Sequence, residues 1–249
     1  MNNYFIFLLN FDKHIHYSME NSMENIKENI KENRDIILKQ IKDIHKNSFF
    51  MKAGLPKLIA VSKKQQEYKI DEALMCGQRF FGENRVQEAI QRWENRIKEY
   101  NDIELRLIGP LQTNKVKQAL EIFNVIETID REKLANSIAN NFDNKSKTKS
   151  FYIQVNTGNE EQKAGISSLE ASDFIDYCKN KLSLPISGLM CIPPEKEEPA
   201  MHFSLLRKIA LKNNLIELSM GMSNDFEEAI KFGATSVRIG SKFFGDREY

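Results

Sequence analysis

Residues 58–63 read Leu-Ile-Ala-Val-Ser-Lys, a short apolar run that ends in a serine and a lysine. Seven further runs of β-branched or aromatic residues follow it, and segments of helical period separate them. The eight expected strands cover residues 58–62, 79–83, 104–108, 124–129, 150–156, 186–192, 216–220 and 236–240. Short strands that alternate with helices are typical of a parallel sheet with helical crossovers.

The segments between the strands predict helices at Glu67 to Cys76, Val86 to Tyr100, Asn114 to Ile122, Arg131 to Asn141, Leu169 to Asn180, Pro199 to Asn213 and Asp225 to Phe232. Thr113 and Ser223 stand where they could cap the helices that follow them. Repeated strand–helix units favour a closed α/β fold, the (β/α)8 TIM barrel, because closure removes both edges of the sheet. The alternative is a doubly wound open sheet, which is disfavoured because neither GxGxxG after the first strand nor GxxxxGK[ST] occurs.

The segment before the first strand has a pattern of its own. Residues 18–33 read SMENSMENIKENIKEN, a repeat close to the helical period, and isoleucines at 26, 30, 37, 41 and 44 form one stripe. This predicts a leading amphipathic helix over 23–48 that packs on the body of the protein, because the register is too short and irregular for a coiled coil. Residues 1–22 are expected to be disordered or a misassigned start, with Met19 or Met23 as initiator, so that 23–249 form one domain.

Composition restricts the compartment and the partners. Lys and Arg number 36 against 35 Asp and Glu, and a net charge of +1 gives no general attraction to nucleic acid or anionic membranes. The apolar run at 4–9 is far shorter than the ~20 residues of a membrane span. Three cysteines without a CxxC pair fit a reducing compartment and small buried side chains, and the four scattered histidines predict no metal site. We expect a cytoplasmic monomer.

The last two strands run into sequences that can hold a phosphate. Strand seven continues into Ser219-Met220-Gly221-Met222-Ser223-Asn224, and strand eight into Arg238-Ile239-Gly240-Ser241. Each alone would be an ordinary turn with a helix cap. In a TIM barrel, however, the loops after these two strands frequently bind phosphate, and here they offer two glycines for close backbone approach and three serine hydroxyls.

Two cations stand near this predicted phosphate site. Alternation on strand eight points Arg238 into the barrel, where its partner could be a carboxylate such as Glu83 or Glu127, or else a ring nitrogen or phosphate of a ligand. Lys63 could be a solvated lysine on the rim. It could instead be a nucleophile for an aldehyde, because burial and the charges of Lys64 and Arg238 would lower its pKa. We expect a Schiff base with a phosphorylated aldehyde.

The chain resembles the pyridoxal-phosphate homeostasis proteins, which are single-domain barrels similar to the barrel domain of alanine racemase. The segments that carry the resemblance are LIAVSK at 58–63, GQRFFGENRVQEA at 77–89, LIGPLQTNKVK at 107–117, QVNTGNEEQKAGI at 154–166, GLMCIPP at 188–194 and the gap-free stretch at 218–249. It implies a site for pyridoxal 5'-phosphate (PLP) formed by Lys63, Asn84, Ser219, Met220, Arg238, Gly240 and Ser241.

The resemblance also implies a role for most of these residues. Lys63 would form the internal aldimine, and Arg238 would face the pyridine nitrogen, which weakens the cofactor as an electron sink. Ser219, Gly240 and Ser241 fall where the family holds the phosphate, and Asn84 falls near the ring. Two positions depart from the family, and the role of a third residue stays open. Gln65 and Arg85 replace a family lysine and tyrosine, and Lys163 matches a family lysine whose role is uncertain.

The function implied by the resemblance is intracellular PLP (vitamin B6) homeostasis. The protein would store the aldehyde and hand it to apo-enzymes as a carrier or buffer, and would not be an enzyme. A two-base racemase needs a second acid/base group facing Lys63, which alanine racemases take from an additional β-domain and a partner subunit. The alternatives are a PLP-dependent racemase-like enzyme, a Schiff-base aldolase, or an interaction protein that docks through the 23–48 helix.

Overall fold

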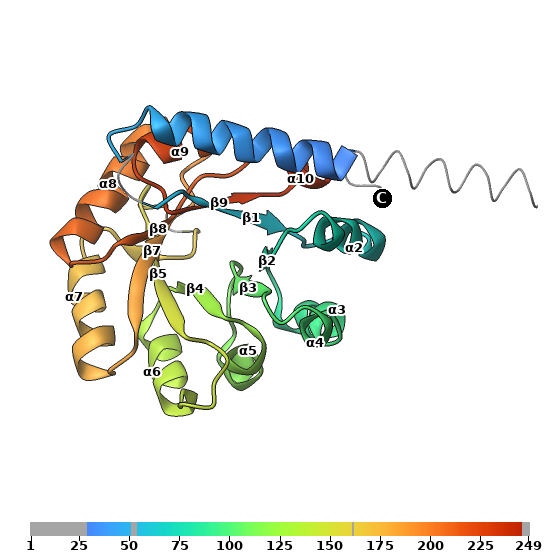
Figure 1. The fold of residues 1–249 in the computed structure, drawn as a ribbon. Coiled ribbons are helices and arrows are strands. Elements are labelled where there is room, and N and C mark those ends of the chain that lie inside the picture. The colour runs from blue at the N-terminus through green and yellow to red at the C-terminus, as the bar shows by residue number, and fades with distance from the viewer. Residues whose placement is uncertain (1–28, 51–53, 161, 246–249) are drawn as a thin grey trace, which may run out of the picture.

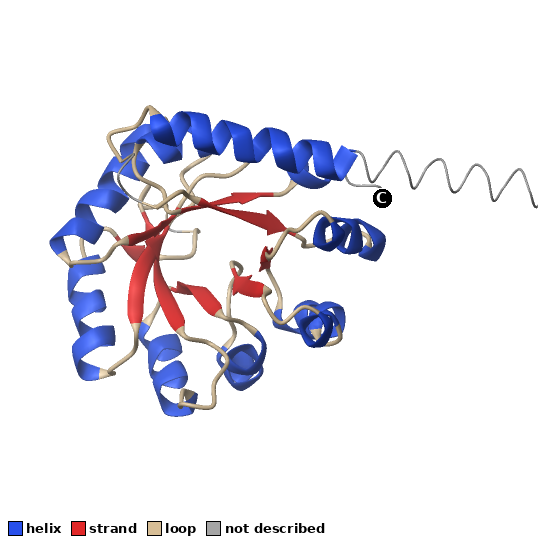
Figure 2. Ribbon diagram, in the orientation of Figure 1, coloured by secondary structure: helices blue, strands red, loops and turns tan. Residues whose placement is uncertain are grey.

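The strands close into a parallel barrel. The computed structural model describes residues 29–50, 54–160 and 162–245, and the expected disorder or later start within residues 1–22 lies outside these ranges. The strands of the barrel are β1 (Lys57–Val61), β2 (Phe80–Glu83), β3 (Glu104–Leu107), β4 (Val125–Ile129), β5 (Ser150–Asn156), β7 (Ile186–Met190), β8 (Glu217–Ser219) and β9 (Ser236–Ile239). Each strand pairs in parallel with the next, and β9 pairs with β1 (Figure 1, Figure 2). The predicted (β/α)8 barrel is confirmed, and the open sheet is excluded.

The helices lie outside the ring of strands (Figure 2). They are α2 (Glu67–Met75), α3 (Val86–Trp93), α4 (Arg96–Glu99), α5 (Val116–Ile122), α6 (Glu132–Asn141), α7 (Ala171–Asp176), α8 (Pro199–Lys212), α9 (Phe226–Lys231) and α10 (Ser241–Phe244). The helix expected at 86–100 is therefore interrupted. The Arg96 guanidinium donates to the Arg92 carbonyl at 2.7 Å, which is the acceptor that the backbone of a continuous helix would use.

Other short elements were not predicted from the sequence. A 3₁₀ turn, η1 (Thr113–Lys115), precedes α5; a π-helical turn, η2 (Tyr177–Lys181), ends α7; and a two-residue strand, β6 (Ile166–Ser167), pairs with the end of β5. The predicted caps at Thr113 and Ser223 are wrong. Lys115 and Asp225 occupy the N-cap positions of α5 and α9, and neither makes a capping hydrogen bond from its side chain.

The leading segment is helical over residues 29–46 and lies along the outside of the barrel near β9, β1 and α10 (Figure 1). Ile30, Ile37 and Ile41 are buried in the core shared with the barrel, and the Asn33 amide donates to the Phe243 carbonyl at 3.2 Å. The prediction that this helix packs on the body of the protein is confirmed. It covers a part of the ring where α10, with only four residues, is too short to do so.

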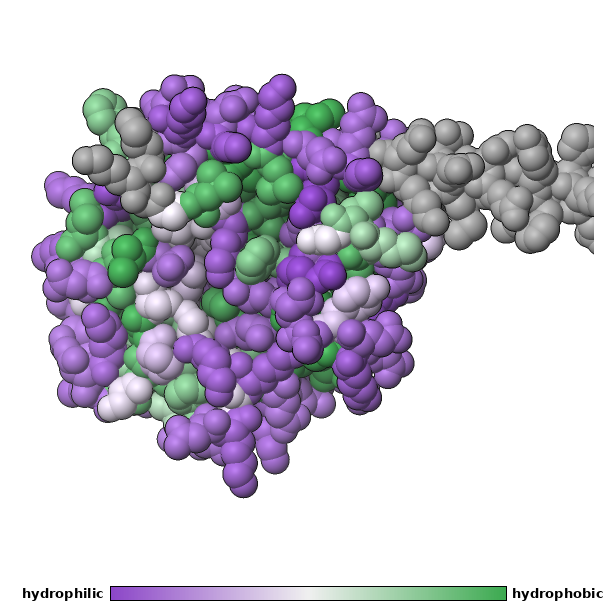
Figure 3. All heavy atoms as spheres, in the orientation of Figure 1, coloured by the Kyte–Doolittle hydropathy of each residue, from purple (hydrophilic) through white to green (hydrophobic). Residues whose placement is uncertain are grey.

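Alternation along the strands separates two layers of side chains. Leu58, Ala60, Val237 and Ile239 point outward and belong to the core between strands and helices, where Trp93 is fully buried as predicted. Polar and charged side chains cover most of the outer face seen in Figure 3. Within the ranges that the structure describes, no helix combines the length and apolar character needed to cross a membrane.

The interior of the barrel is strongly polar. Arg106, Glu127, Ser219 and Arg238 point into it and are almost completely buried. A second, small apolar cluster of Val125, Tyr152 and Met190 fills the space beside them. The inward direction predicted for Arg238 is thus confirmed, and the ring encloses a charged network in place of a purely aliphatic core.

Candidate functional site

The end of β1 carries Lys63 on a tight turn. The Gln65 N–H donates to the Ser62 carbonyl at 3.1 Å, which closes residues 62–65 into a turn. Lys64 occupies the left-handed region with φ of 58°, a conformation that favours glycine and that other residues adopt only where neighbouring contacts hold them. Lys63 is half-buried, whereas Lys64 is exposed. The turn after β1 therefore shields Lys63 more than it shields Lys64.

Arg92 of α3 holds this turn from the helix layer. Its guanidinium donates to the carbonyls of Ser62 at 3.0 Å and Gln65 at 3.1 Å, and pairs with the Glu83 carboxylate at 3.0 Å. Burial alone would lower the pKa of Arg92, but the charges and hydrogen bonds of Glu83 and Glu67 together outweigh burial, and the pKa is raised. Nothing in the sequence pattern marks Arg92 as a partner of this turn, because it lies in α3, 30 residues after Ser62.

Glu83 belongs to the same cluster and is fully buried. Its Oε1 atom accepts hydrogen bonds from the Ser62 hydroxyl at 2.7 Å and the Trp93 indole N–H at 3.0 Å, in addition to Arg92. Glu83 thus lies between β2 and α3, on the outside of the barrel wall. The suggestion that it pairs with Arg238 is wrong.

Two hydroxyls of the predicted phosphate site, those of Ser223 and Ser241, lie together beyond the ends of β8 and β9. The Ser241 hydroxyl donates to the Ser223 hydroxyl at 3.3 Å, and Ser241 is exposed. Between β8 and Ser223, Gly221 has a φ of +90°, and a Cβ atom there would lie 2.6 Å from the Ala229 Cβ. Only glycine therefore fits the turn that brings the two hydroxyls together. Ser223 was recognised as a hydroxyl near the mouth, but the resemblance did not include it.

The register of β1 and β9 brings the two halves of the predicted site together. Ala60 pairs with Ile239, and a Cβ atom on Gly240 would lie 3.6 Å from the Val61 Cβ. Gly240 thus lies against the last residue of β1, two residues before Lys63. The lysine turn and the Gly240–Ser241 turn are neighbours at the carboxyl ends of adjacent strands.

Ser219 and Met220 lie deeper than the predicted phosphate site. Both are fully buried, and Met220 belongs to the core between strands and helices. Ser219 is the last residue of β8, and its hydroxyl donates to the Glu127 carboxylate at 2.5 Å and accepts from Arg238 at 2.7 Å. Neither residue is at the surface of the mouth, where Ser223 and Ser241 meet.

Arg238 is 3% exposed and finds its partners inside the protein. One Nη atom donates to the Ser219 hydroxyl and the other to the Cys191 carbonyl, at 2.7 and 2.8 Å. Of the carboxylates considered, Glu127 is reached only through Ser219. Glu127 pairs directly with Arg106 at 2.8 Å. Burial alone would lower the pKa of Arg106, but Glu127 together with Tyr152 and Glu104 outweighs burial and raises that pKa.

Asn84 and Lys163 complete the residues named from the sequence. Asn84 follows β2 at the mouth and is half-buried; a Cβ atom on Gly109 would lie 2.3 Å from the Asn84 carbonyl oxygen, so Gly109 permits the close approach that fixes this turn. Lys163 pairs with Glu160 at 2.6 Å and donates to the Pro193 carbonyl at 3.4 Å. Its ammonium group therefore joins the loop after β5 to the loop after β7.

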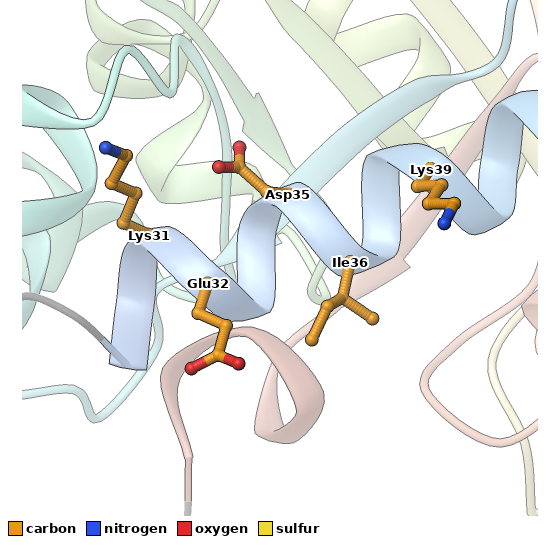
Figure 4. A pocket seen from close by; sticks show the side chains of 5 residues that line it. All are labelled: Lys31, Glu32, Asp35, Ile36 and Lys39. Atoms are coloured by element: carbon orange, nitrogen blue, oxygen red, sulfur yellow. The ribbon is translucent and has the colours of Figure 1, made fainter.

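The hollows that the described residues form away from this mouth include two of different character. One, of about 490 Å³, runs along the leading helix, where Figure 4 shows Lys31, Glu32, Asp35, Ile36 and Lys39. Four of these five side chains are charged. The described isoleucines of the apolar stripe pack against the barrel core instead, three of them buried and Ile44 partly buried. The other hollow, of about 590 Å³, lies at the amino ends of the strands, which in TIM barrels contribute to stability rather than chemistry.

Comparison with known sequences gives consistent matches. The profile of the family described as alanine racemase, N-terminal domain, matches residues 24–248. The pyridoxal phosphate homeostasis protein of Aquifex aeolicus is 39% identical over 202 residues, which cover 78% of this chain and 88% of that protein. The protein of the same name from Escherichia coli is 36% identical over 205 residues, with 77% and 86% covered.

Solved structures agree with the sequence matches. PipY of Synechococcus elongatus, determined without PLP and with PLP bound, is 32% and 31% identical in the two comparisons, with TM-scores of 0.70 and 0.67. Both comparisons cover 82% of this chain and all of PipY. Alanine racemase of Corynebacterium glutamicum has a TM-score of 0.63 at 16% identity, with 89% of this chain and 62% of the racemase covered, a similarity of fold.

Proposed function

The chain belongs to the pyridoxal phosphate homeostasis protein family, and from that premise we propose that it binds PLP and acts as a cellular carrier or buffer of this cofactor. The observation that supports the proposal most directly is the contact between the end of β1 and Gly240. It puts the amine of Lys63 and the hydroxyls of Ser223 and Ser241 on neighbouring turns of one barrel mouth. An aldehyde and a phosphate on one small molecule match that pair of groups.

The residues fit the cofactor in three places. When bound, PLP supplies an aldehyde that condenses with a lysine amine and releases water. Lys63 is the amine that we assign to this bond, because its turn follows the carboxyl end of β1 and is held by Arg92. Ser223, Ser241 and the Gly240 backbone would hold the phosphate, Arg238 would interact with the ring nitrogen, and Asn84 would lie near the ring.

The proposal describes a carrier rather than an enzyme. The relatives that match most of this chain are named for homeostasis, and the similarity to alanine racemase is one of fold at 16% identity. We further propose that the protein works as a monomer in the cytoplasm and passes PLP to apo-enzymes. Racemisation of an amino acid by the pure protein, at a rate that depends on Lys63, would overturn the carrier function in favour of a racemase.

The test of cofactor binding is the visible absorbance of the purified protein after incubation with PLP. We expect a band that is lost in Lys63→Ala and retained in the matched control Lys64→Ala, since Lys64 is the exposed neighbour on the same turn. Borohydride reduction followed by peptide mass spectrometry should locate the attached cofactor on Lys63. A band that survives in Lys63→Ala, with the label on another lysine, would exclude this site.

Transfer is tested separately. The loaded protein is mixed with an apo-enzyme that needs PLP, and recovery of that enzyme's activity is followed together with loss of the visible band. A carrier should restore activity faster than the same amount of loaded protein releases PLP into buffer alone. Equal rates would mean that the protein only stores the cofactor.

A further inference from the structure

We propose that Ser219 and Glu127 are positioning residues that act through Arg238, and that Ser219 is not a ligand of the phosphate. The inference rests on the proposed function, because it concerns how the same mouth holds PLP. It differs from the role that the family resemblance implies for Ser219. It also adds Glu127, which stands in no part of the cofactor site inferred from the sequence.

The observation behind it is a continuous network of hydrogen-bonded side chains through the barrel. Arg238 donates to Ser219 at 2.7 Å, Ser219 donates to Glu127 at 2.5 Å, and Arg106 donates to Glu127 at 2.8 Å. Below these, Arg106 pairs with Glu104 at 2.6 Å, and Lys57 pairs with Glu104 at 3.0 Å. This network therefore runs from the amino ends of the strands to Arg238, the residue that we assign to the ring nitrogen.

The bonding capacity of Ser219 favours this role. A serine hydroxyl has one proton to donate and two lone pairs to accept with. Its proton goes to Glu127, so it has none left for a phosphate oxygen, which needs donors. Its position agrees, because Ser219 is fully buried within β8, whereas Ser223 and Ser241 lie beyond the strand ends.

The charges of the buried side chains explain why this network would hold Arg238 in place. Arg106 and Arg238 are both buried cations, and Glu127, itself fully buried, is bonded to the first directly and to the second through Ser219. A buried cation is stable only where acceptors surround it. Arg238 donates to the Ser219 hydroxyl and to the Cys191 carbonyl, and together these two acceptors fix the plane of its guanidinium. Loss of the hydroxyl leaves that plane free to rotate.

The experiment compares PLP with pyridoxal, which has the aldehyde and ring but no phosphate. Dissociation constants for both are measured by absorbance titration of the full chain. The ratio of the Kd of pyridoxal to the Kd of PLP reports the phosphate contacts alone. Ser241→Ala should lower the ratio by about tenfold or more, since a hydrogen bond to a charged group contributes about 1.5–3 kcal/mol. Ser219→Ala should weaken both ligands by a similar factor, roughly tenfold by the same reasoning, and leave the ratio unchanged.

A second readout separates positioning from general damage to the fold. The visible maximum of the bound cofactor should shift in Ser219→Ala and in Glu127→Gln, in the same direction as in Arg238→Lys, because all three change what faces the ring nitrogen. Ser219→Thr keeps the hydroxyl and should restore the maximum. Thermal melts identify any variant that is not folded, and Glu127→Gln, which keeps a hydrogen-bonding side chain of the same shape, carries the test if Ser219→Ala does not fold.

The outcomes are distinct. If Ser219→Ala lowers the PLP-to-pyridoxal preference as much as Ser241→Ala does, Ser219 is a phosphate ligand and the inference is wrong. If both Ser219→Ala and Glu127→Gln leave the absorbance maximum unchanged, no positioning through Arg238 takes place. Failure of the proposed function itself looks different, because the wild-type protein would then show no band that depends on Lys63.

Discussion

Arg92→Ala is the substitution that most directly tests how the Lys63 turn is held. Arg92 is 12% exposed at its side chain and bonds a carboxylate, Glu83, that is 0% exposed. The same guanidinium bonds the carbonyls of Ser62 and Gln65. Removing it leaves a buried carboxylate without its counter-charge and takes one donor from each of two turn carbonyls, of which Ser62 keeps the Gln65 N–H.

The magnitude follows from the partners that remain. Breaking a buried ion pair by removing one partner costs about 3–5 kcal/mol. After the substitution, Glu83 still accepts hydrogen bonds from the Ser62 hydroxyl and the Trp93 indole, so we expect the lower end of that range, about 3 kcal/mol. For a chain of this length each kcal/mol corresponds to roughly 2–4 °C in Tm, which predicts a decrease of about 6–12 °C.

Urea unfolding followed by circular dichroism measures the loss, and Arg96→Ala is the matched control. Arg96 lies four positions on and also pairs with carboxylates, but its partners Glu67 and Asp71 are 57% and 45% exposed. Exposed pairs contribute about 0–1 kcal/mol, so the control should change the midpoint little. In a Glu83→Gln background, Arg92→Ala should cost less than half as much, because the two residues act as a pair. Equal losses for Arg92→Ala and Arg96→Ala would refute the reasoning.

Three further predictions concern stability and reactivity. Ile41→Ala should cost about 2–5 kcal/mol of unfolding free energy, because Ile41 is 0% exposed in the barrel core, whereas Ile36→Ala, at 49% exposure, should stay within about 0.5 kcal/mol in the same urea titration. Burial alone would raise the pKa of Glu104, but Arg106 and Lys57 together outweigh burial, and the pKa is lowered. The stabilisation from the charged Glu104 is therefore present above about pH 4.3 and is lost as pH falls through the lowered pKa. The wild type should lose more unfolding free energy between pH 7 and 3 than Glu104→Gln does. Parallel stability profiles of the two proteins would contradict this. Burial raises the pKa of Cys178 to about 12, so iodoacetamide at pH 8 should label it only after denaturation, as read by peptide mass spectrometry.

The barrel itself was predictable from the chain because strand and helix periods alternate with little interruption. The strand expected at 150–156 matches β5, and the other barrel strands differ from expectation by one or two residues at their ends. The breaks in the helices were not predictable in the same way. The interruption between α3 and α4 coincides with a bond from the Arg96 side chain to a backbone carbonyl, which depends on rotamers rather than on the apolar period.

The site shows a second limit of reasoning from the sequence. Strand order placed the loops after β8 and β9 next to each other, and the register of β1 with β9 confirms that Gly240 lies beside the end of β1. The sequence could not show how deep in the barrel each residue lies, because a motif such as Ser219-Met220-Gly221 does not show at which residue strand pairing ends. Pairing includes Ser219, which therefore lies inside the barrel rather than at its mouth.

The two glutamates considered as partners of Arg238 show which of these limits could have been overcome. Glu83 is two positions after Phe81, whose side chain packs in the core between strands and helices, so alternation alone assigns Glu83 to the outer side of β2. Ile126 also points outward, so alternation places the next residue, Glu127, inside the barrel. An irregularity in the pairing between Ile126 and Ile129 then breaks the alternation along β4. A bulge redirects side chains without leaving a mark in the apolar pattern. The barrel thus keeps one glutamate on each side of its wall, where Glu83 holds the turn of Lys63 and Glu127 holds Arg238 through Ser219.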